Sequence, residues 1–159
     1  MRVMLLSALA VFGIDQLTKW AVVHRLNLKN DLAIDVLPPL LNFRMGWNTG
    51  INFGLFADSP EFMRFVLVAL PILVSGFILW WGNRNLGRLI TRMGAGAIIG
   101  GALANALDRV IYGAVADFLN MSCCGINNPY TFNTADIGIF VGAFALVAFD
   151  DAKGEHKAG

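Results

Sequence analysis

Apolar residues along this chain form long, nearly uninterrupted blocks. The blocks cover approximately residues 3–23, 63–81, 93–111 and 135–149. An α-helix needs about 20 residues to cross a hydrocarbon core of about 30 Å. The first three blocks have this length, and the fourth has it when it is extended to about 133–153. The pattern predicts a mainly α membrane protein, with a bundle of four transmembrane helices in one integral membrane domain over residues 1–159.

The composition agrees with a membrane location. The chain is 57% hydrophobic and 14% charged, whereas soluble proteins have about 25% charged residues. A net charge of +1 gives no electrostatic basis for binding nucleic acid. The apolar run after Arg2 resembles a secretory signal peptide, but no A-x-A-like cleavage site follows it, so we expect it to remain as the first span.

Positive charge predicts how the spans are oriented. The short segment 82–92 carries three arginines and no acidic residue, which is typical of a cytoplasmic loop. Both termini are therefore expected in the cytoplasm, and segments 24–62 and 112–134 are expected outside.

The longer outer segment is expected to form a small extramembrane β-sheet on the outer face. The stretches LLNFRMGWN and INFGLF contain branched and aromatic residues interrupted by glycines, which is typical of short strands and turns. Pro38 and Pro39 exclude a continuous helix there. The apolar side chains indicate that this segment lies on the membrane surface or packs over the bundle.

Two acidic residues are the candidate catalytic groups. Asp117 follows the third span and Asp136 begins the fourth, so both are expected on helices at the outer membrane edge. A charge near hydrocarbon is costly and marks a functional candidate. Two neighbouring carboxylates share one proton and can activate water for peptide hydrolysis as a general acid and base. The alternative is that both acids simply face water.

Other polar residues in the spans have structural explanations. Asp15 and Lys19 have the spacing of a helical ion pair, although Asp15 could also cap or brace the active region and Lys19 could reach toward the outer surface. Asp108 and Arg109 are expected to pair with other polar groups in the bundle. The alternative for Arg109 is to hold a lipid phosphate or to orient a substrate carbonyl.

The glycines of the third span and the two adjacent cysteines allow further predictions. The glycines at positions 94, 96, 100 and 101 predict close packing of the third span against its neighbours. For Cys123 and Cys124 we expect free thiols rather than a disulfide between adjacent residues. The cysteines and histidines lack metal-site spacing, so no metal or cofactor is expected.

Five short motifs, in order along the chain, resemble those of the bacterial lipoprotein signal peptidases, also called signal peptidase II. They are DQLTK at 15–19, NTGINFGLF at 48–56, GGALANALDRV at 100–110, VADF at 115–118 and FNTADIGI at 132–139. Each motif alone is weakly specific, whereas the ordered set is highly specific. Three positions depart from the family pattern: Ile51-Asn52 replaces two alanines, and Ala104 replaces a glycine. These departures concern substrate preference and inhibitor affinity rather than the two acids.

The resemblance implies an intramembrane aspartic endopeptidase of the bacterial inner membrane. Such enzymes remove signal peptides from diacylglyceryl-modified prolipoproteins, cut before the lipidated cysteine, and are inhibited by globomycin-type cyclic peptides. The family's catalytic aspartates correspond to Asp117 and Asp136. Its other polar motif residues, expected to bind substrate or support the dyad, correspond to Asp15, Lys19, Asn48, Gly50, Asn105, Asp108, Arg109 and Asn133.

Two other classes of function remain as alternatives. In a small proton-coupled transporter, acidic residues would form a relay across the membrane, but the inner halves of the apolar blocks 63–81 and 135–149 contain no ionisable residue. A non-catalytic lipid-binding or assembly factor would tolerate the Asp117→Asn or Asp136→Asn substitution, whereas a peptidase would not.

Overall fold

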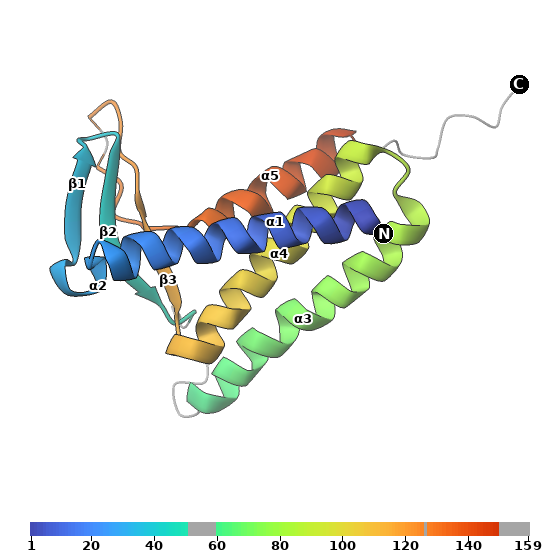
Figure 1. Ribbon diagram of the computed structural model, residues 1–159, viewed down its shortest axis with the longest axis horizontal. Helices are drawn as coiled ribbons and strands as arrows, with labels where there is room; N and C mark the ends of the chain where they lie inside the picture. The colour runs from blue at the N-terminus through green and yellow to red at the C-terminus, as the bar shows by residue number, and fades with distance from the viewer. Residues whose placement is uncertain (51–59, 126, 150–159) are drawn as a thin grey trace, which may run out of the picture.

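The computed structural model describes residues 1–50, 60–125 and 127–149. Its long helices form a bundle, and a small sheet covers one end of it, away from the N-terminus (Figure 1). In chain order the elements are α1 (Arg2–Lys19), the π-helical η1 (Trp20–Arg25), α2 (Leu28–Asp31), β1 (Ala33–Leu37), β2 (Leu41–Asn48), α3 (Pro60–Asn85), α4 (Leu89–Tyr112), β3 (Val115–Asn120) and α5 (Thr134–Phe149).

The helices agree with the predicted spans. Three described helices are long and apolar enough to cross a membrane: α1 together with η1, α3 and α4. Helix α5 is also apolar, and it has 16 residues. The predicted extension of this span to residue 153 falls in 150–159, which lies outside the described residues.

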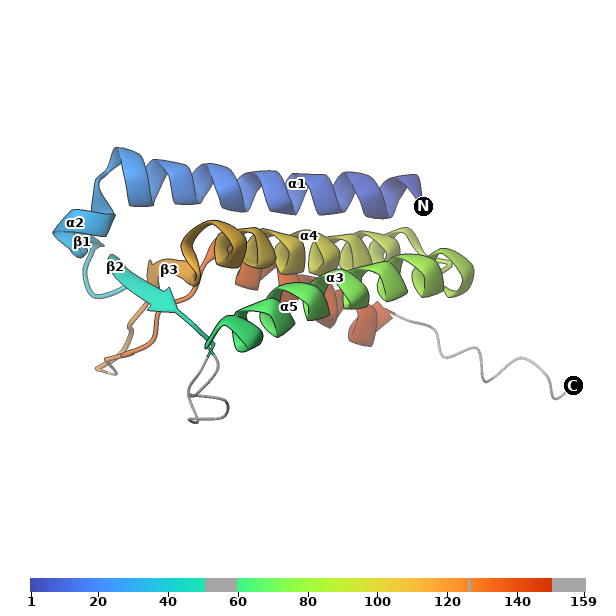
Figure 2. The same ribbon diagram turned by 90° about the horizontal axis from the view of Figure 1, so that it is seen from below.

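Helix α4 is the centre of the bundle, and it contacts α1, α3 and α5 (Figure 2). Glycines allow this close approach. A Cβ atom at Gly94 would lie 2.7 Å from the carbonyl oxygen of Gly142 on α5, and one at Gly100 would collide with the Ala8 carbonyl on α1. The predicted role of these glycines in helix packing is confirmed.

Helix α3 is the most peripheral of the spans. Only 6% of its apolar window is buried inside the protein, compared with 56% for α4. Its last turns pack beside an apolar cluster of Met4, Leu86 and Ala95 at the end of the bundle opposite the sheet. Hydrophobic packing therefore anchors α3 mainly at that far end.

The sheet is antiparallel, in the order β1-β2-β3. Gly46 of β2 pairs with Asp117 of β3, and the register shifts between Phe43 and Gly46. Val23 and Phe118 belong to an apolar cluster that fixes the sheet on the end of α1 and η1.

Strand β3 corrects one prediction, because Asp117 lies on a strand and not on a helix. The reason is Gly113, whose φ of 78° ends α4 in a left-handed turn. The sequence that follows then pairs with β2. The strand predicted for INFGLF falls on residues 51–56, outside the described residues.

The expectation of free thiols was wrong, since Cys123 and Cys124 form a disulfide. Cys124 has a φ of 60° and Gly125 a φ of 82°. The disulfide and this left-handed turn lie within the segment that connects β3 to α5.

Candidate active site

Asp117 and Asp136 converge on one residue at the junction of the sheet and the bundle. The Asn133 side-chain amide donates to Asp117 Oδ1 at 2.6 Å. The Asn133 backbone N–H donates to Asp136 Oδ2 at 3.1 Å. The carboxylates come from different elements, β3 and α5, so tertiary folding brings them together.

Asp136 also has a structural reason to stand at the start of a helix. The Asn133 side-chain oxygen accepts the Asp136 backbone N–H at 3.0 Å, and Asp136 accepts the Asn133 N–H in return. This reciprocal arrangement is a capping box, and a negative charge is favourable at a helix N-terminus. The second carboxylate oxygen of Asp136 accepts the Asn105 amide at 2.9 Å. Both carboxylate oxygens of Asp136 are therefore held in one orientation by hydrogen bonds.

Asp117 is only 4% exposed, and its environment alters its acidity. Burial raises the pKa of Asp117 to about 6, and the nearby charge of Asp136 contributes to the rise. Hydrogen bonds from Asn133 and Asn48, and the charge of Lys19, act in the opposite direction on this pKa. The Asn48 amide donates to Asp117 Oδ2 at 3.2 Å. The charge of Asp136 therefore influences the protonation of Asp117.

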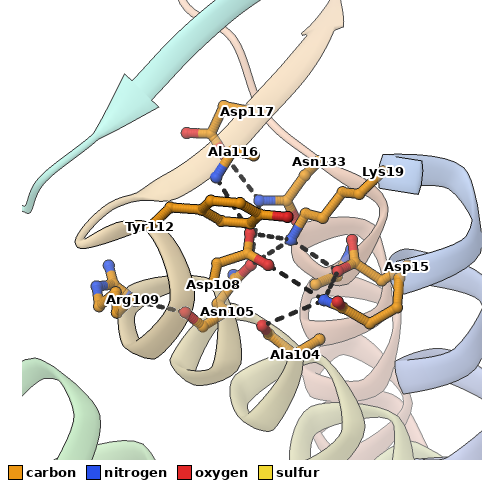
Figure 3. A network of polar contacts seen from close by, with 12 residues as sticks. Asp15, Lys19, Ala104, Asn105, Asp108, Arg109, Tyr112, Ala116, Asp117 and Asn133 are labelled. Atoms are coloured by element: carbon orange, nitrogen blue, oxygen red, sulfur yellow. Dashed lines mark hydrogen bonds and ion pairs between the residues drawn. The ribbon is translucent and has the colours of Figure 1, made fainter. Parts of the chain in front are cut away.

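A buried ion cluster supports this pair (Figure 3). Lys19 Nζ lies 2.7 Å from both Asp15 and Asp108, and it donates to Asn105 Oδ1 at 3.2 Å. Lys19 is 5% exposed and the two acids are fully buried. The three donors of the ammonium group are thereby occupied. The alternative in which Lys19 reaches toward the surface was wrong, because two buried carboxylates hold it inside.

Each acid of this cluster holds the backbone immediately before one of the candidate catalytic acids. Asp15 Oδ1 accepts the Ala135 N–H at 2.8 Å, next to Asp136. Asp108 Oδ2 accepts the Ala116 N–H at 3.1 Å, next to Asp117. Both expectations for Asp15 therefore hold together, since it forms the ion pair and also braces α5.

Arg109 and Gly50 lie at the rim of the site. Arg109 Nε is buried and has no hydrogen-bond partner among the described residues. A Cβ atom at Gly50 would lie 3.7 Å from Arg109 Nη2 and 2.8 Å from a methyl group of Leu67. Gly50 has a φ of 75°, and its N–H donates to Asn48 Oδ1 at 2.9 Å. This glycine therefore keeps space in front of a guanidinium that retains a free donor within the described part of the chain.

Several site residues were missed by sequence reasoning. A cavity of about 230 Å³ next to Asp117 is walled by β2 and by Pro129, Tyr130 and Thr131. The Asn120 side chain holds this wall by donating to the carbonyl oxygens of Asn128 and Tyr130 at 2.8 and 2.9 Å. The sequence signal was weak because these residues reach the site only through tertiary contacts, made by the Asn120 side chain and by the pairing of β2 with β3.

Gln16 and Thr134 were also missed as members of the polar cluster, although both lie inside the quoted motifs. Gln16 Nε2 donates to Asp108 at 3.1 Å, and the Thr134 hydroxyl donates to Asp15 at 2.8 Å. Within the described ranges, no group of three or more histidine, cysteine or acidic side chains has the arrangement of a metal site.

Comparison with known proteins gives matches over nearly the whole chain. The family model described as signal peptidase (SPase) II matches residues 7–150. A lipoprotein signal peptidase of Methylobacterium sp. (strain 4-46) is 35% identical over 95% of this chain and 92% of its own length. One from Rhodopseudomonas palustris (strain ATCC BAA-98 / CGA009) is 36% identical over 92% and 90%. A solved bacterial membrane enzyme has a similar fold, with a TM-score of 0.77 at 23% identity over 93% of this chain and 92% of that chain.

Proposed function

Since the chain belongs to the signal peptidase II family, we propose that it is an intramembrane aspartic endopeptidase. Its substrates are diacylglyceryl-modified prolipoproteins, and it cuts before the lipidated cysteine. Asp117 and Asp136 are the catalytic acids. The observation that carries this proposal is the position of Asn133, which donates a hydrogen bond to each carboxylate.

In the proposed mechanism the pair holds one proton, on Asp117. Burial raises the pKa of Asp117 to about 6, which suits a general acid. Asp136 removes a proton from a water molecule, whose oxygen attacks the scissile carbonyl carbon, while Asp117 protonates the carbonyl oxygen. The C–N bond of the tetrahedral intermediate then breaks. Asp136 returns its proton to the leaving amine, and the intermediate's hydroxyl proton goes back to Asp117.

The remaining polar residues have supporting roles in this proposal. Asn105 and the ion cluster of Asp15, Lys19 and Asp108 hold the two acids in place. Asn48, Gly50 and Arg109 form the rim that contacts the substrate backbone. Arg109 Nε, which has no hydrogen-bond partner among the residues that the structure describes, fits a substrate carbonyl oxygen. A globomycin-type inhibitor is expected to compete for the same rim.

The depth of the site supports a lipid-modified substrate. Arg25 stacks on Trp20 at the site end, and Arg84 stacks on Trp80 at the far end. Tryptophan and arginine are typical anchors at membrane interfaces. Arg64 and Arg84 are separated by 20 positions of α3, or about 30 Å, the thickness of the hydrocarbon core. The acids then lie at one interface, proposed as the outer one with both termini cytoplasmic, and the acyl chains can stay in the bilayer during cleavage.

The test is a gel-shift cleavage assay with purified protein in detergent and a diacylated precursor. We expect Asp117→Asn and Asp136→Asn each to reduce the rate by about 10²-fold or more without unfolding the protein. Asp35→Asn is the matched control, because Asp35 is an acid on an exposed part of the sheet. A globomycin-type inhibitor should block the wild type, and an unlipidated precursor should be cut poorly. Wild-type turnover by either dyad variant would refute the mechanism, and equal rates on both precursors would refute the substrate assignment.

A further inference from the structure

Arg64 joins the beginning of α3 to the end of α4. Its Nε donates to the carbonyl oxygen of Arg109 at 2.8 Å, and its Nη2 donates to that of Val110 at 2.6 Å. Both carbonyls belong to the last turn of α4, where helix carbonyls can accept further hydrogen bonds and the helix dipole is negative. A guanidinium group suits this position because its planar fork can reach two acceptors at once. The first turns of α3 lie beside the last turn of α4 (Figure 1).

The turn that Arg64 holds leads directly into the candidate site. The Arg109 carbonyl also accepts the Gly113 N–H at 3.1 Å, and Gly113 begins the turn into β3. Asp117 follows four residues later. The side chain of Arg109 itself interacts electrostatically with Asp117. Any loosening of this turn therefore moves a rim residue and a candidate catalytic acid together.

A second set of contacts also holds the last turn of α4 in place. Tyr112, the last residue of α4, has its ring 5.5 Å from that of Trp47 on β2, and its hydroxyl lies 3.0 Å from His24 Nε2. Arg64 supplies the corresponding polar contact from α3. Apolar packing holds α3 mainly at its far end. The two hydrogen bonds from Arg64 to α4 therefore hold the end of α3 that lies next to the site.

We propose that Arg64 is a positioning residue for the cleavage reaction: by capping α4 it fixes Arg109 and the turn that carries Asp117. This inference rests on the proposed function. The hydrogen bonds of the Arg64 side chain within the described residues go to these two backbone carbonyls and not to either acid. Its loss should lower kcat, and it should weaken substrate binding only slightly, because the acyl chains are expected to supply most of the binding.

The test compares Arg64→Gln, Arg64→Lys and the control Arg84→Gln, which removes an arginine from the other end of α3. Cleavage kinetics on a diacylated precursor and hydrogen–deuterium exchange of residues 109–117 are measured on each. For Arg64→Gln we expect kcat to fall about tenfold with KM within about twofold, together with faster exchange in 109–117. Arg64→Lys, which keeps the charge and loses the fork, should be intermediate in both measurements. Arg84→Gln should match the wild type in both.

Three results would overturn this role for Arg64. They are a wild-type kcat in Arg64→Gln, a change confined to KM, or unchanged exchange in 109–117. If Arg64→Gln does not fold, Arg64→Lys provides the test. A wild-type kcat and wild-type exchange in Arg64→Lys would show that the two-donor guanidinium fork is not required, and would overturn the proposed role. Failure of the proposed function looks different, because the wild type would then not cleave the precursor or Asp117→Asn would remain active.

Discussion

Replacing Asn133 with alanine removes the amide that donates to Asp117 Oδ1 at 2.6 Å. A hydrogen bond to an ionised group contributes about 1.5–3 kcal/mol, and one pKa unit corresponds to about 1.4 kcal/mol. The pKa of Asp117 is already raised to about 6, chiefly by burial. Because the lost bond favours the ionised form, the substitution should raise this pKa by a further one to two units or so.

The pH dependence of cleavage measures this change. If the pair works with one shared proton, the alkaline limb of the pH–rate profile reports the loss of that proton. The alkaline limb of Asn133→Ala should therefore move to higher pH by about one to two units. The assay is cleavage of a diacylated precursor from about pH 4 to 10.

Asn133→Ser separates the effect on acidity from the effect on the helix. Serine keeps an oxygen that can cap α5, but it has no amide to reach Asp117. It should show the same movement of the alkaline limb, and it should keep the roughly 1 kcal/mol of stability that alanine loses with the cap. The reasoning is refuted if the alkaline limb of both folded variants stays in place or moves to lower pH.

Three further predictions concern stability in detergent, measured by thermal unfolding. The folded state raises the pKa of Asp117 to about 6, so the wild type should lose stability as pH rises from about 4 to 6. At pH 8, Asp117→Asn should therefore be more stable than the wild type by roughly 1–3 kcal/mol. An equal difference in stability at pH 4 would contradict this prediction. Gly100→Ala should destabilise by about 1–3 kcal/mol through its clash with α1, whereas Gly76→Ala, which meets open space, should be neutral or stabilising. Lys19→Met should cost about 3–5 kcal/mol by leaving buried carboxylates unpaired, and Arg44→Met, at an exposed ion pair, less than about 1 kcal/mol. A similar loss of stability in Gly100→Ala and Gly76→Ala would contradict the close packing assigned to Gly100. A similar loss of stability in Lys19→Met and Arg44→Met would contradict the burial assigned to the Lys19 ion cluster.

Much of the fold was predictable because membrane spans have a strong local signal. The length and apolarity of the blocks predicted the helices, and the glycines of α4 predicted its close packing. The resemblance to signal peptidase II is confirmed by the family match over residues 7–150. The sequence and the family together indicate a multi-pass bacterial membrane protein.

Strand β3 was not predictable in the same way. VADFLN follows a long helix, and only pairing with β2 and the left-handed turn at Gly113 make it a strand. The same limit applies to Arg64, whose partners are backbone carbonyls 45 and 46 positions away. Contacts between a side chain and a distant backbone leave no mark on the pattern of residue types.

In the proposed mechanism, the ion cluster of Asp15, Lys19 and Asp108 makes hydrolysis conditional on assembly of the bundle. Asp15 of the first span holds residue 135, and Asp108 of α4 holds residue 116, so each contacts the backbone next to one catalytic candidate. A nascent chain with only some of its helices associated would lack the geometry for hydrolysis. A protease that resides among other membrane proteins would in this way stay harmless to its neighbours until its own insertion is finished.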